Sequence, residues 1–320
     1  MSGDRFFTVG VVGACGYVGR ELVRWIGLHP RLKLSKVFSR TFAGTQYGDA
    51  VPAFKGFVDL EIQAIPEVFE ELDILMLATP HGAAAGLIPK TEKIGTVVDL
   101  SRDHRHADGW AYGQPEWLSG NLKGAARISA PGCFATAISL ACAPLVESKQ
   151  LRGPVRVSAA TGSTGSGASP KAATHHPDRF TNIKAYKILK HQHVPEISDF
   201  LGRIGTAPRI DFVPVSAPID RGIFATVFAD VSADFDLKEA FLDAYKDSPM
   251  IRIRDESPNL RALRGTALTD ISVHQDGESA VILVAIDNLG KGAASQAIQA
   301  LNISLGFPDS EGLLVPSCAS

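Results

Sequence analysis

The first hundred residues alternate short apolar runs with stretches of helical periodicity. Four of the apolar runs are compact enough to predict buried strands, at residues 6–12, 32–39, 73–80 and 96–101. Residues 17–28 carry apolar side chains on one helical face and end before Pro30, and the Ala-rich residues 82–93 predict a second helix. Strands that alternate with helices are typical of an α/β protein with a Rossmann-type doubly wound parallel sheet, whose ligands bind at the carboxyl ends of the strands.

The pattern changes after residue 130. The sequence predicts a helix at 135–148 and a strand at 155–160, followed by a loop at 161–174 that is rich in Gly, Ser and Thr. We expect this loop to be mobile and to cover a site. Residues 271–287 are typical of two strands joined by a turn at Asp276-Gly277, which indicates an antiparallel pair. The second half is therefore predicted to be an α+β domain with a mainly antiparallel sheet.

Length and composition narrow the range of functions. The chain has 320 residues, 45% of them hydrophobic, so it is long enough to form two hydrophobic cores. A helix expected at 290–307 could pack on the core of the first domain. The formal net charge of -2 gives no basic face for nucleic acid or an anionic membrane, and no apolar stretch approaches the ~20 residues of a spanning helix. The four cysteines form neither a CxxC pair nor a disulfide framework. We expect a cytoplasmic protein with reduced thiols that acts on a small molecule.

A glycine motif lies where the first strand turns into the first helix. Gly13, Gly16 and Gly19 have the spacing GxxGxxG, which lets a backbone approach a pyrophosphate and present helix N-terminal amides to it. Tyr17 and Val18, which open the helix, are expected to contact the same group. A tight turn that binds no ligand remains the alternative, because glycines are common in many kinds of turn.

The end of the second strand indicates which dinucleotide would bind. An NAD enzyme usually carries an acidic residue there, about 20 residues after the glycines, to bind the ribose 2′-hydroxyl. This chain has Ser39-Arg40 instead, and a hydroxyl beside a guanidinium suits a 2′-phosphate. The sequence therefore favours NADP(H), with a solvated surface role for Arg40 as the alternative.

Cys133 is a candidate nucleophile. It lies between a Pro131-Gly132 break and a predicted helix, so its thiolate would face unpaired amides and the positive end of the helix dipole, both of which lower a thiol pKa. Cys142 looks like a core residue, Cys15 belongs to the glycine loop, and Cys318 lies near the chain end. Among the four thiols, only Cys133 has the setting of a reactive one.

A thiol and a nicotinamide together suit the reduction of an activated acyl group, because a thioester is electrophilic and held in position. The chemistry also requires a proton carrier, and histidine titrates in the right range. His191 and His193 are two residues apart, so in an extended segment both would face one cleft. A metal site would need further ligands, for which only His175 and His176 lie nearby, and we expect none. A purely structural histidine remains the alternative for each.

Short sequence motifs occur along the chain from residue 13 to residue 302. They are GACGYVGRELVRWI at 13–26, SRTFAG at 39–44, PHG at 80–82, VVDLSRDHR at 97–105, APGCFATA at 130–137, HQHVPEI at 191–197, DRG at 220–222, LRGT at 263–266 and DNLGKGAASQAIQALN at 287–302. In this order they resemble N-acetyl-gamma-glutamyl-phosphate reductase, an enzyme of arginine biosynthesis. Each motif alone is weak, and the full set is specific.

The resemblance implies a mechanism and its residues. Cys133 would attack the γ-acyl phosphate, NADPH would reduce the thioester, and His193, with His191 beside it, would transfer the proton. The glycine loop, Ser39 and Arg40 would contact NADP, and Asn288 and Gly290 would approach the nicotinamide. Pro80 is expected to contact the cofactor as well.

The resemblance also implies a domain organisation. Residues 1–133 and 288–320 would form the dinucleotide-binding domain, because the C-terminal helix folds back, and residues 134–287 the catalytic and oligomerisation domain. Family members are homo-oligomers, so we expect a dimer or tetramer.

Two departures leave the acyl group open. The family usually has Tyr-Pro after the cysteine, where this chain has Phe134-Ala135. Residues 161–180 look closer to the related reductase of lysine biosynthesis, whose substrate is held by a carrier protein, whereas APGC, HVPEI and LRGT favour the arginine branch. The alternatives are thus the same chemistry on a carrier-bound aminoadipyl or glutamyl phosphate or on aspartyl phosphate, and, in another class, a nucleotide-sensing regulator without activity.

Four arginines are candidates for holding anionic substrate groups, because a guanidinium pairs bidentately with carboxylate or phosphate: Arg105, Arg179, Arg221 and Arg264. Arg179 and Arg221 are the first choices, and Glu196 in HVPEI is also expected to contact the substrate. For each arginine, an exposed or structural role is the alternative.

Overall fold

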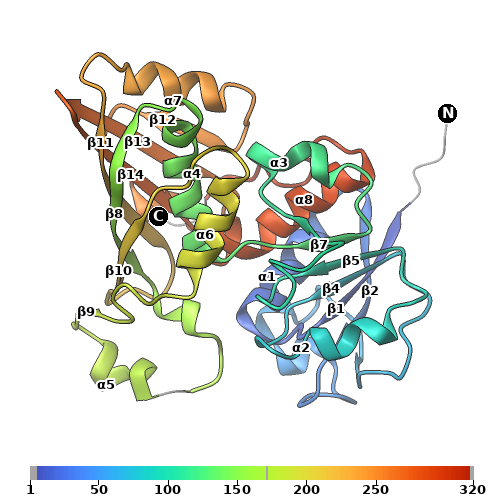
Figure 1. The fold of residues 1–320 in the computed structure, drawn as a ribbon. Coiled ribbons are helices and arrows are strands. Elements are labelled where there is room, and N and C mark those ends of the chain that lie inside the picture. Colours follow the sequence, from blue (N-terminus) through green and yellow to red (C-terminus); the bar gives the residue numbers. More distant parts are fainter. Residues whose placement is uncertain (1–5, 171, 318–320) are drawn as a thin grey trace. The chain divides into compact units, whose positions relative to one another are not determined.

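The computed structural model describes residues 6–170 and 172–317, which divide into two compact units (Figure 1). The first unit consists of the chain up to Pro131 together with Ala293–Leu313. The second unit holds Gly132–Gly292 and the chain from Leu314 on. We expected residues 132–133, 288–292 and 314–317 in the first domain, and their contacts group them with the second unit.

The first unit is built on a fully parallel sheet. Its strands lie in the order β3 (Ile62–Gln63), β2 (Leu32–Phe38), β1 (Phe7–Val12), β4 (Ile74–Leu77), β5 (Thr96–Asp99), β7 (Arg127–Ser129) and β6 (Ala111–Tyr112). Strand order reverses at β1, which has β2 on one side and β4 on the other. This is the switch point at which doubly wound sheets bind ligands, so the predicted Rossmann-type fold is confirmed.

The helices of this unit follow from the apolar pattern. They are α1 (Tyr17–Leu28), α2 (Tyr47–Ala50), α3 (Pro115–Leu122) and α8 (Ser295–Leu305), with 3₁₀ turns η1 (Pro52–Phe54) and η2 (Ala85–Lys90). The α1 helix has the predicted bounds and buries Leu22, Trp25 and Ile26. The helix predicted at 82–93 is wrong: only η2 forms there, with Pro89 inside it, because proline lacks the amide that a longer α-helix needs.

The second unit contains a mixed sheet in which four of the six strand pairs are antiparallel. The strands lie in the order β12 (Ile251–Arg254), β13 (Thr269–Asp276), β14 (Ser279–Ile286), β11 (Ile223–Val231), β8 (Leu151–Thr161), β10 (Ile210–Ser216) and β9 (Lys184–Ala185). The predicted hairpin is confirmed as β13 and β14, which turn at Gly277 with φ +56°. The α+β expectation holds for this unit.

Helices of the second unit cover the sheet and carry the candidate chemistry. They are α4 (Cys133–Glu147), α5 (His176–Arg179), α6 (His193–Gly202) and α7 (Leu237–Tyr245), with short turns η3 (Ser163–Ser166), η4 (Ala172–Thr174), η5 (Leu260–Leu263) and a π-helical turn η6 (Gly290–Ala294). The α4 helix contacts β8, β11 and β14 on one side and α6 on another (Figure 1). Every residue from Phe134 to Val146 is buried, so α4 is the core of this unit.

Strand register brings four loops to one edge of the second sheet. Thr161 at the end of β8 pairs with Ile223 at the start of β11, and Ile223 pairs with Ile286 at the end of β14. Ile286 in turn pairs with Thr269 at the start of β13. We call this edge the rim. Residues 162–164, 217–222, 263–266 and 287–292 all lie next to these four strand ends.

Within the described residues, none of the helices combines the length and apolar character that crossing a membrane requires.

Candidate active site

The glycine loop of the first unit is closely packed and leads into a helix whose start has no side-chain cap. Gly13 has φ +79°, and a Cβ there would lie 2.4 Å from the Ala78 carbonyl oxygen. A Cβ on Gly19 would lie 2.2 Å from the Gly13 carbonyl oxygen. Gly16 is the N-cap of α1, where no side chain caps the helix and no acidic residue lies in the first turn. The amides that open α1, including those of Tyr17 and Val18, therefore present the positive end of the helix to an anion.

Two contacts that the sequence did not reveal hold this loop in place. The buried Tyr47 hydroxyl donates to the Ala14 carbonyl oxygen at 3.0 Å. The Arg20 Nε donates to the Cys15 carbonyl oxygen at 2.8 Å. Burial raises the pKa of the Cys15 thiol, with opposing effects from Arg20 and from a hydrogen bond with Ser39. Cys15 is thus a protonated packing residue of the loop.

The residues predicted to select the dinucleotide lie beside this loop. The Gly13 amide donates to the Phe38 carbonyl oxygen, which places the end of β2 next to the glycines. The Ser39 hydroxyl accepts from the Thr41 amide at 3.2 Å. Arg40 is exposed, and no carboxylate of the described chain pairs with it. A guanidinium without an internal counter-ion suits a 2′-phosphate.

Pro80 lies three residues beyond the end of β4 and two beyond Ala78, whose carbonyl oxygen lies against Gly13. It opens a loop that a carboxylate from another loop holds in place. The Asp103 carboxylate accepts from the Gly82 amide at 2.7 Å and from the Ala84 amide at 3.0 Å. The motif that supplies Asp103 also supplies Asp99, which is fully buried and bonds the His104 Nδ1 at 2.6 Å. The loop after β4 is therefore held through its backbone amides, which donate to a carboxylate of the loop after β5.

In the second unit, Cys133 is the first residue of α4. Gly132 is the N-cap, no side chain caps the helix, and no acidic residue lies in its first turn. Cys133 is only partly buried, whereas Cys142 is fully buried and burial raises the pKa of its thiol to about 12. The exposed end of a helix favours a thiolate, and a buried apolar site opposes one.

Helix α6 packs on the loop before this thiol. The Glu196 carboxylate accepts from the Gly132 amide at 2.8 Å, and a Cβ on Gly132 would lie 2.2 Å from the His193 Nε2. Gly132 is therefore the residue that lets the imidazole lie against the backbone next to Cys133. Glu196, which we expected to bind substrate, is 2% exposed and holds the backbone of this loop.

The two histidines lie close together, and burial shifts the pKa of His191. His193 begins α6, so the extended segment that we predicted around it is wrong, yet the two rings still lie 4.7 Å apart. His191 is 4% exposed, and burial, with a smaller effect of Lys187, lowers its pKa to about 4. Its Nδ1 accepts from the His193 amide at 3.3 Å. His191 is therefore neutral near pH 7, with the proton on Nε2.

Phe134, which replaces the tyrosine usual after the cysteine, packs in this aromatic group. Its ring centroid lies 5.4 Å from that of His191 and 5.1 Å from that of Phe212. On the other side of His191 lies the Tyr186 ring, at 5.9 Å. Burial, followed by the nearby Cys133, raises the pKa of the Tyr186 phenol, so this hydroxyl remains protonated. The sequence did not reveal Tyr186, because nothing in its neighbourhood along the chain marks it.

The candidate arginines are in different environments. In the second unit, Arg221 donates to the Asp287 carboxylate at 2.7 Å, and Arg264 pairs with Asp220. Arg179 donates from Nη2 to the Thr161 carbonyl oxygen at 3.0 Å and from Nη1 to the Ser216 hydroxyl, and both acceptors are uncharged. In the first unit, Arg105 is 5% exposed and its Nε donates to the Ala130 carbonyl oxygen.

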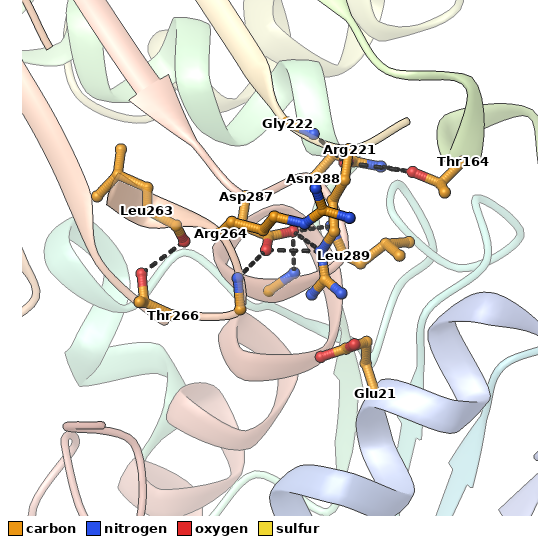
Figure 2. Close-up of polar contacts among 12 residues, drawn as sticks. Glu21, Thr164, Arg221, Gly222, Leu263, Arg264, Thr266, Asp287, Asn288 and Leu289 are labelled. Carbon is orange, nitrogen blue, oxygen red and sulfur yellow. Dashed lines mark hydrogen bonds and ion pairs between the residues drawn. The ribbon is translucent and has the colours of Figure 1, made fainter. Parts of the chain in front are cut away.

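Asn288 and Gly290, expected near the nicotinamide, are tied to the rim of the second unit. The Asn288 amide oxygen accepts from the Gly222 amide at 2.6 Å, and its amide nitrogen donates to the Thr164 hydroxyl at 3.1 Å (Figure 2). A Cβ on Gly290 would lie 2.3 Å from the Thr266 carbonyl oxygen. These contacts explain why residues 288–292 belong to the second unit.

Within residues 6–170 and 172–317, no group of three or more His, Cys, Asp or Glu side chains is placed so that it could hold a metal ion.

Comparison with known proteins accounts for both units. Residues 8–125 match the family model described as semialdehyde dehydrogenase, NAD binding domain, and residues 133–288 match semialdehyde dehydrogenase, dimerisation domain. Over 318 residues, 36% are identical to the N-acetyl-gamma-glutamyl-phosphate reductase of Azobacteroides pseudotrichonymphae, covering 97% of this chain and 99% of that protein. The chain belongs to this family. The reductase of Methanocella arvoryzae is 35% identical over 95% of this chain and 97% of its own.

Solved structures support the same fold. Aspartate semialdehyde dehydrogenase II of Vibrio cholerae, complexed with ASA, has a TM-score of 0.76 at 16% identity, covering 93% of this chain and 98% of that one. The Candida albicans enzyme with NADP has a TM-score of 0.72 at 14% identity, with 93% and 99% covered. At such identity the likeness concerns fold alone. The family resemblance drawn from the sequence motifs is confirmed by the relatives above.

Proposed function

We propose that this chain is an NADPH-dependent oxidoreductase that converts N-acetyl-gamma-glutamyl phosphate to N-acetylglutamate 5-semialdehyde through a thioester on Cys133. The observation that carries the proposal is a partly exposed thiol at the uncapped start of α4, with His193 against the preceding glycine. The relatives that cover nearly the whole chain bear the name of this activity. Retention of both groups argues against a regulator without activity.

The residues of the second unit suggest the order of events. The Cys133 thiolate attacks the acyl carbon, the carbon–oxygen bond to phosphate breaks, and inorganic phosphate leaves. When bound, NADPH supplies the hydride that reduces the thioester carbon. His193 donates a proton to the oxygen that becomes negative, giving a thiohemiacetal. His193 then removes that proton as the carbon–sulfur bond breaks, which releases the aldehyde and regenerates the thiolate.

His193 is proposed as the proton carrier, with His191 as its support. A neutral imidazole with a pKa of about 4 is a poor proton donor near pH 7, which argues against His191 in this role. Its Nδ1 bond to the His193 amide helps to fix the start of α6 instead.

The rim suggests which arginine receives the substrate. Arg221 and Arg264 have aspartate partners, so their charges are compensated within the chain. Arg179 is half-buried, burial lowers its pKa, and in the described chain no carboxylate pairs with it. A guanidinium held by neutral acceptors retains its charge for an external carboxylate or phosphate. We therefore propose Arg179 as the anion-binding arginine.

Replacing Arg179 tests this choice. Arg179→Met should raise the KM for the semialdehyde by about 10- to 100-fold, since a charged hydrogen bond contributes about 1.5–3 kcal/mol. Steady-state kinetics in the direction of NADPH formation measures the change. Arg264→Met is the matched control, because it removes a rim arginine whose charge is already paired. Equal effects of the two substitutions would remove Arg179 from the substrate site.

The first unit supports NADP(H) as the cofactor. The start of α1, which no side chain caps, suits the pyrophosphate, and Ser39 with the exposed Arg40 suits the 2′-phosphate. Arg40→Ala should raise the KM for NADPH at least tenfold and leave that for NADH within about twofold, because NADH lacks the phosphate that the guanidinium would bind. Kinetics with both cofactors checks this. A similar rise for both would contradict the assignment.

The acyl group is tested by running the reaction in reverse. NADPH formation is followed with phosphate and the N-acetylglutamyl, aspartyl and aminoadipyl semialdehydes. We expect turnover with the N-acetylglutamyl compound. Turnover of aspartate semialdehyde alone would overturn the family-based substrate. Activity confined to the aminoadipyl compound would favour the carrier-linked alternative, which residues 161–180 suggest.

We also propose that the protein is a cytoplasmic homo-oligomer that assembles through its second unit. The family model matched by residues 133–288 is described as a dimerisation domain. Strands β8 and β11 expose alternate side chains, among them Phe228 with 46% of its surface exposed. The exposed side chains of these two strands are where we expect two copies to meet.

A further inference from the structure

Figure 2 shows the rim of the second unit, where one carboxylate joins three of its loops. Asp287 directly follows β14 and is 1% exposed. Its Oδ1 accepts from the Arg221 Nε at 2.7 Å, and its Oδ2 accepts from the Gly265 amide at 2.5 Å. A single buried side chain thereby holds the loops before β11 and before β13.

The same carboxylate holds the turn in which it lies. Its Oδ1 also accepts from the Leu289 amide at 2.9 Å and from the Gly290 amide at 3.1 Å. The Asp287 carbonyl oxygen accepts from the Gly292 amide at 2.8 Å. Side chain and backbone of one residue thus determine the path of residues 288–292.

This turn ends against the candidate nucleophile. A Cβ on Gly292 would lie 2.9 Å from the Cys133 Cβ and 3.3 Å from its Cα. On the opposite side, Gly290 lies so close to the Thr266 carbonyl oxygen that a Cβ would come within 2.3 Å of it. The turn is therefore confined between the loop before β13 and the first residue of α4, and it has little room to move while Asp287 holds it.

We propose that Asp287 is a positioning residue, which sets the backbone that packs behind Cys133 and fixes Arg221 as an internal counter-ion. The proposal builds on the role of Cys133 in the function proposed above. Its physical basis is charge. A buried carboxylate that faces a guanidinium and three backbone amides satisfies all of them, whereas a neutral amide cannot accept so many hydrogen bonds.

Another buried aspartate in the same sheet provides a matched control. Asp270 on β13 is 4% exposed and receives two hydrogen bonds from Arg252 on β12, at 2.6 Å and 3.0 Å. This pair joins two neighbouring strands and not the turn that backs Cys133. Asp270→Asn therefore damages a similar ion pair without changing the support of the thiol.

The test compares Asp287→Asn with Asp270→Asn in the full-length protein. The readout is the rate of Cys133 alkylation by iodoacetamide, followed by mass spectrometry of the peptide that contains Cys133. We expect Asp287→Asn to slow alkylation and turnover at least tenfold, and Asp270→Asn to leave both within about twofold at a comparable loss of Tm. Equal effects of the two variants, or wild-type alkylation in Asp287→Asn, would overturn the proposal.

A second variant covers the case in which Asp287→Asn does not fold. Arg221→Met combined with Asp287→Asn removes both charges, so no unpaired charge stays buried. We expect this double variant to fold and to retain slow alkylation, because the backbone donors still lack their carboxylate. Wild-type alkylation in the double variant would mean that Asp287 only neutralises Arg221, which contradicts the proposal.

Alkylation does not depend on the acyl substrate, so the two hypotheses can fail separately. If none of the semialdehydes is turned over but Asp287→Asn still slows alkylation, the proposed function fails and the role of Asp287 stands.

Discussion

Cys133→Ser is expected to lower turnover by more than about 10³-fold while the affinity for NADPH stays near that of the wild type. In the proposed mechanism a thiolate attacks the acyl carbon, whereas a serine hydroxyl at the same helix terminus remains protonated near pH 7. An alkoxide is also a much poorer leaving group than a thiolate when the tetrahedral adduct breaks down. Losses of this size are typical when an enzyme nucleophile is removed. Initial rates and fluorescence titration with NADPH measure the two quantities.

The control for this substitution is another cysteine of the same helix. Cys142 is fully buried, and its raised thiol pKa keeps it protonated. Cys142→Ala should lower the Tm by a few degrees and leave turnover within about twofold, because it removes one sulfur atom from a packed core. Activity of Cys133→Ser within tenfold of normal would eliminate the covalent mechanism.

His193→Gln is expected to lower kcat by about 10²- to 10³-fold, which is the usual range for loss of a general acid–base group. Glutamine is close in size and can still lie against Gly132, so the thiol loop should keep its shape. The pH–rate profile between pH 5 and 8 should also change, because the proposed proton carrier is lost. Stopped-flow and steady-state rates across that range provide the measurement.

His191→Gln separates the two imidazoles. Because the pKa of His191 is about 4, this residue does not change charge between pH 5 and 8, and replacing it should leave the shape of the profile unchanged even if the rate falls. Loss of an ionisation in His191→Gln but not in His193→Gln would reverse the two roles.

The nucleotide-binding half of the chain is encoded mostly in local pattern. Helix α1 has the predicted bounds, and the apolar runs that precede and follow it form adjacent parallel strands. Apolar runs and glycine spacings reflect backbone requirements that involve only a few neighbouring residues, so they can be recognised in the sequence. The helix predicted at 82–93 does not form, and this too has a local cause, because Pro89 lies inside that segment. The Asp103 carboxylate that holds the loop comes from a different part of the chain.

The candidate active site was only partly predictable. Cys133 and the histidine pair carry their chemistry in their own neighbourhoods, so motif and residue type pointed to them. The partners of Arg179, Arg221 and Arg264 cannot be found in this way, because Asp287 lies 66 residues from Arg221 and 22 from the Gly265 amide that it also binds. For the same reason, nothing in the sequence indicated that Glu196 accepts a hydrogen bond from the Gly132 amide, 64 residues away.

By itself, the sequence determined the alternation of strands and helices in the first unit, the glycine loop, the candidate thiol and the family, all of which depend on residue type and near-neighbour spacing. Only the tertiary structure decided the charge state of His191, which arginines have their charge compensated and which carboxylate holds the turn behind the thiol. Those properties depend on burial and on partners that the sheet register brings together across the chain, and a linear pattern contains neither.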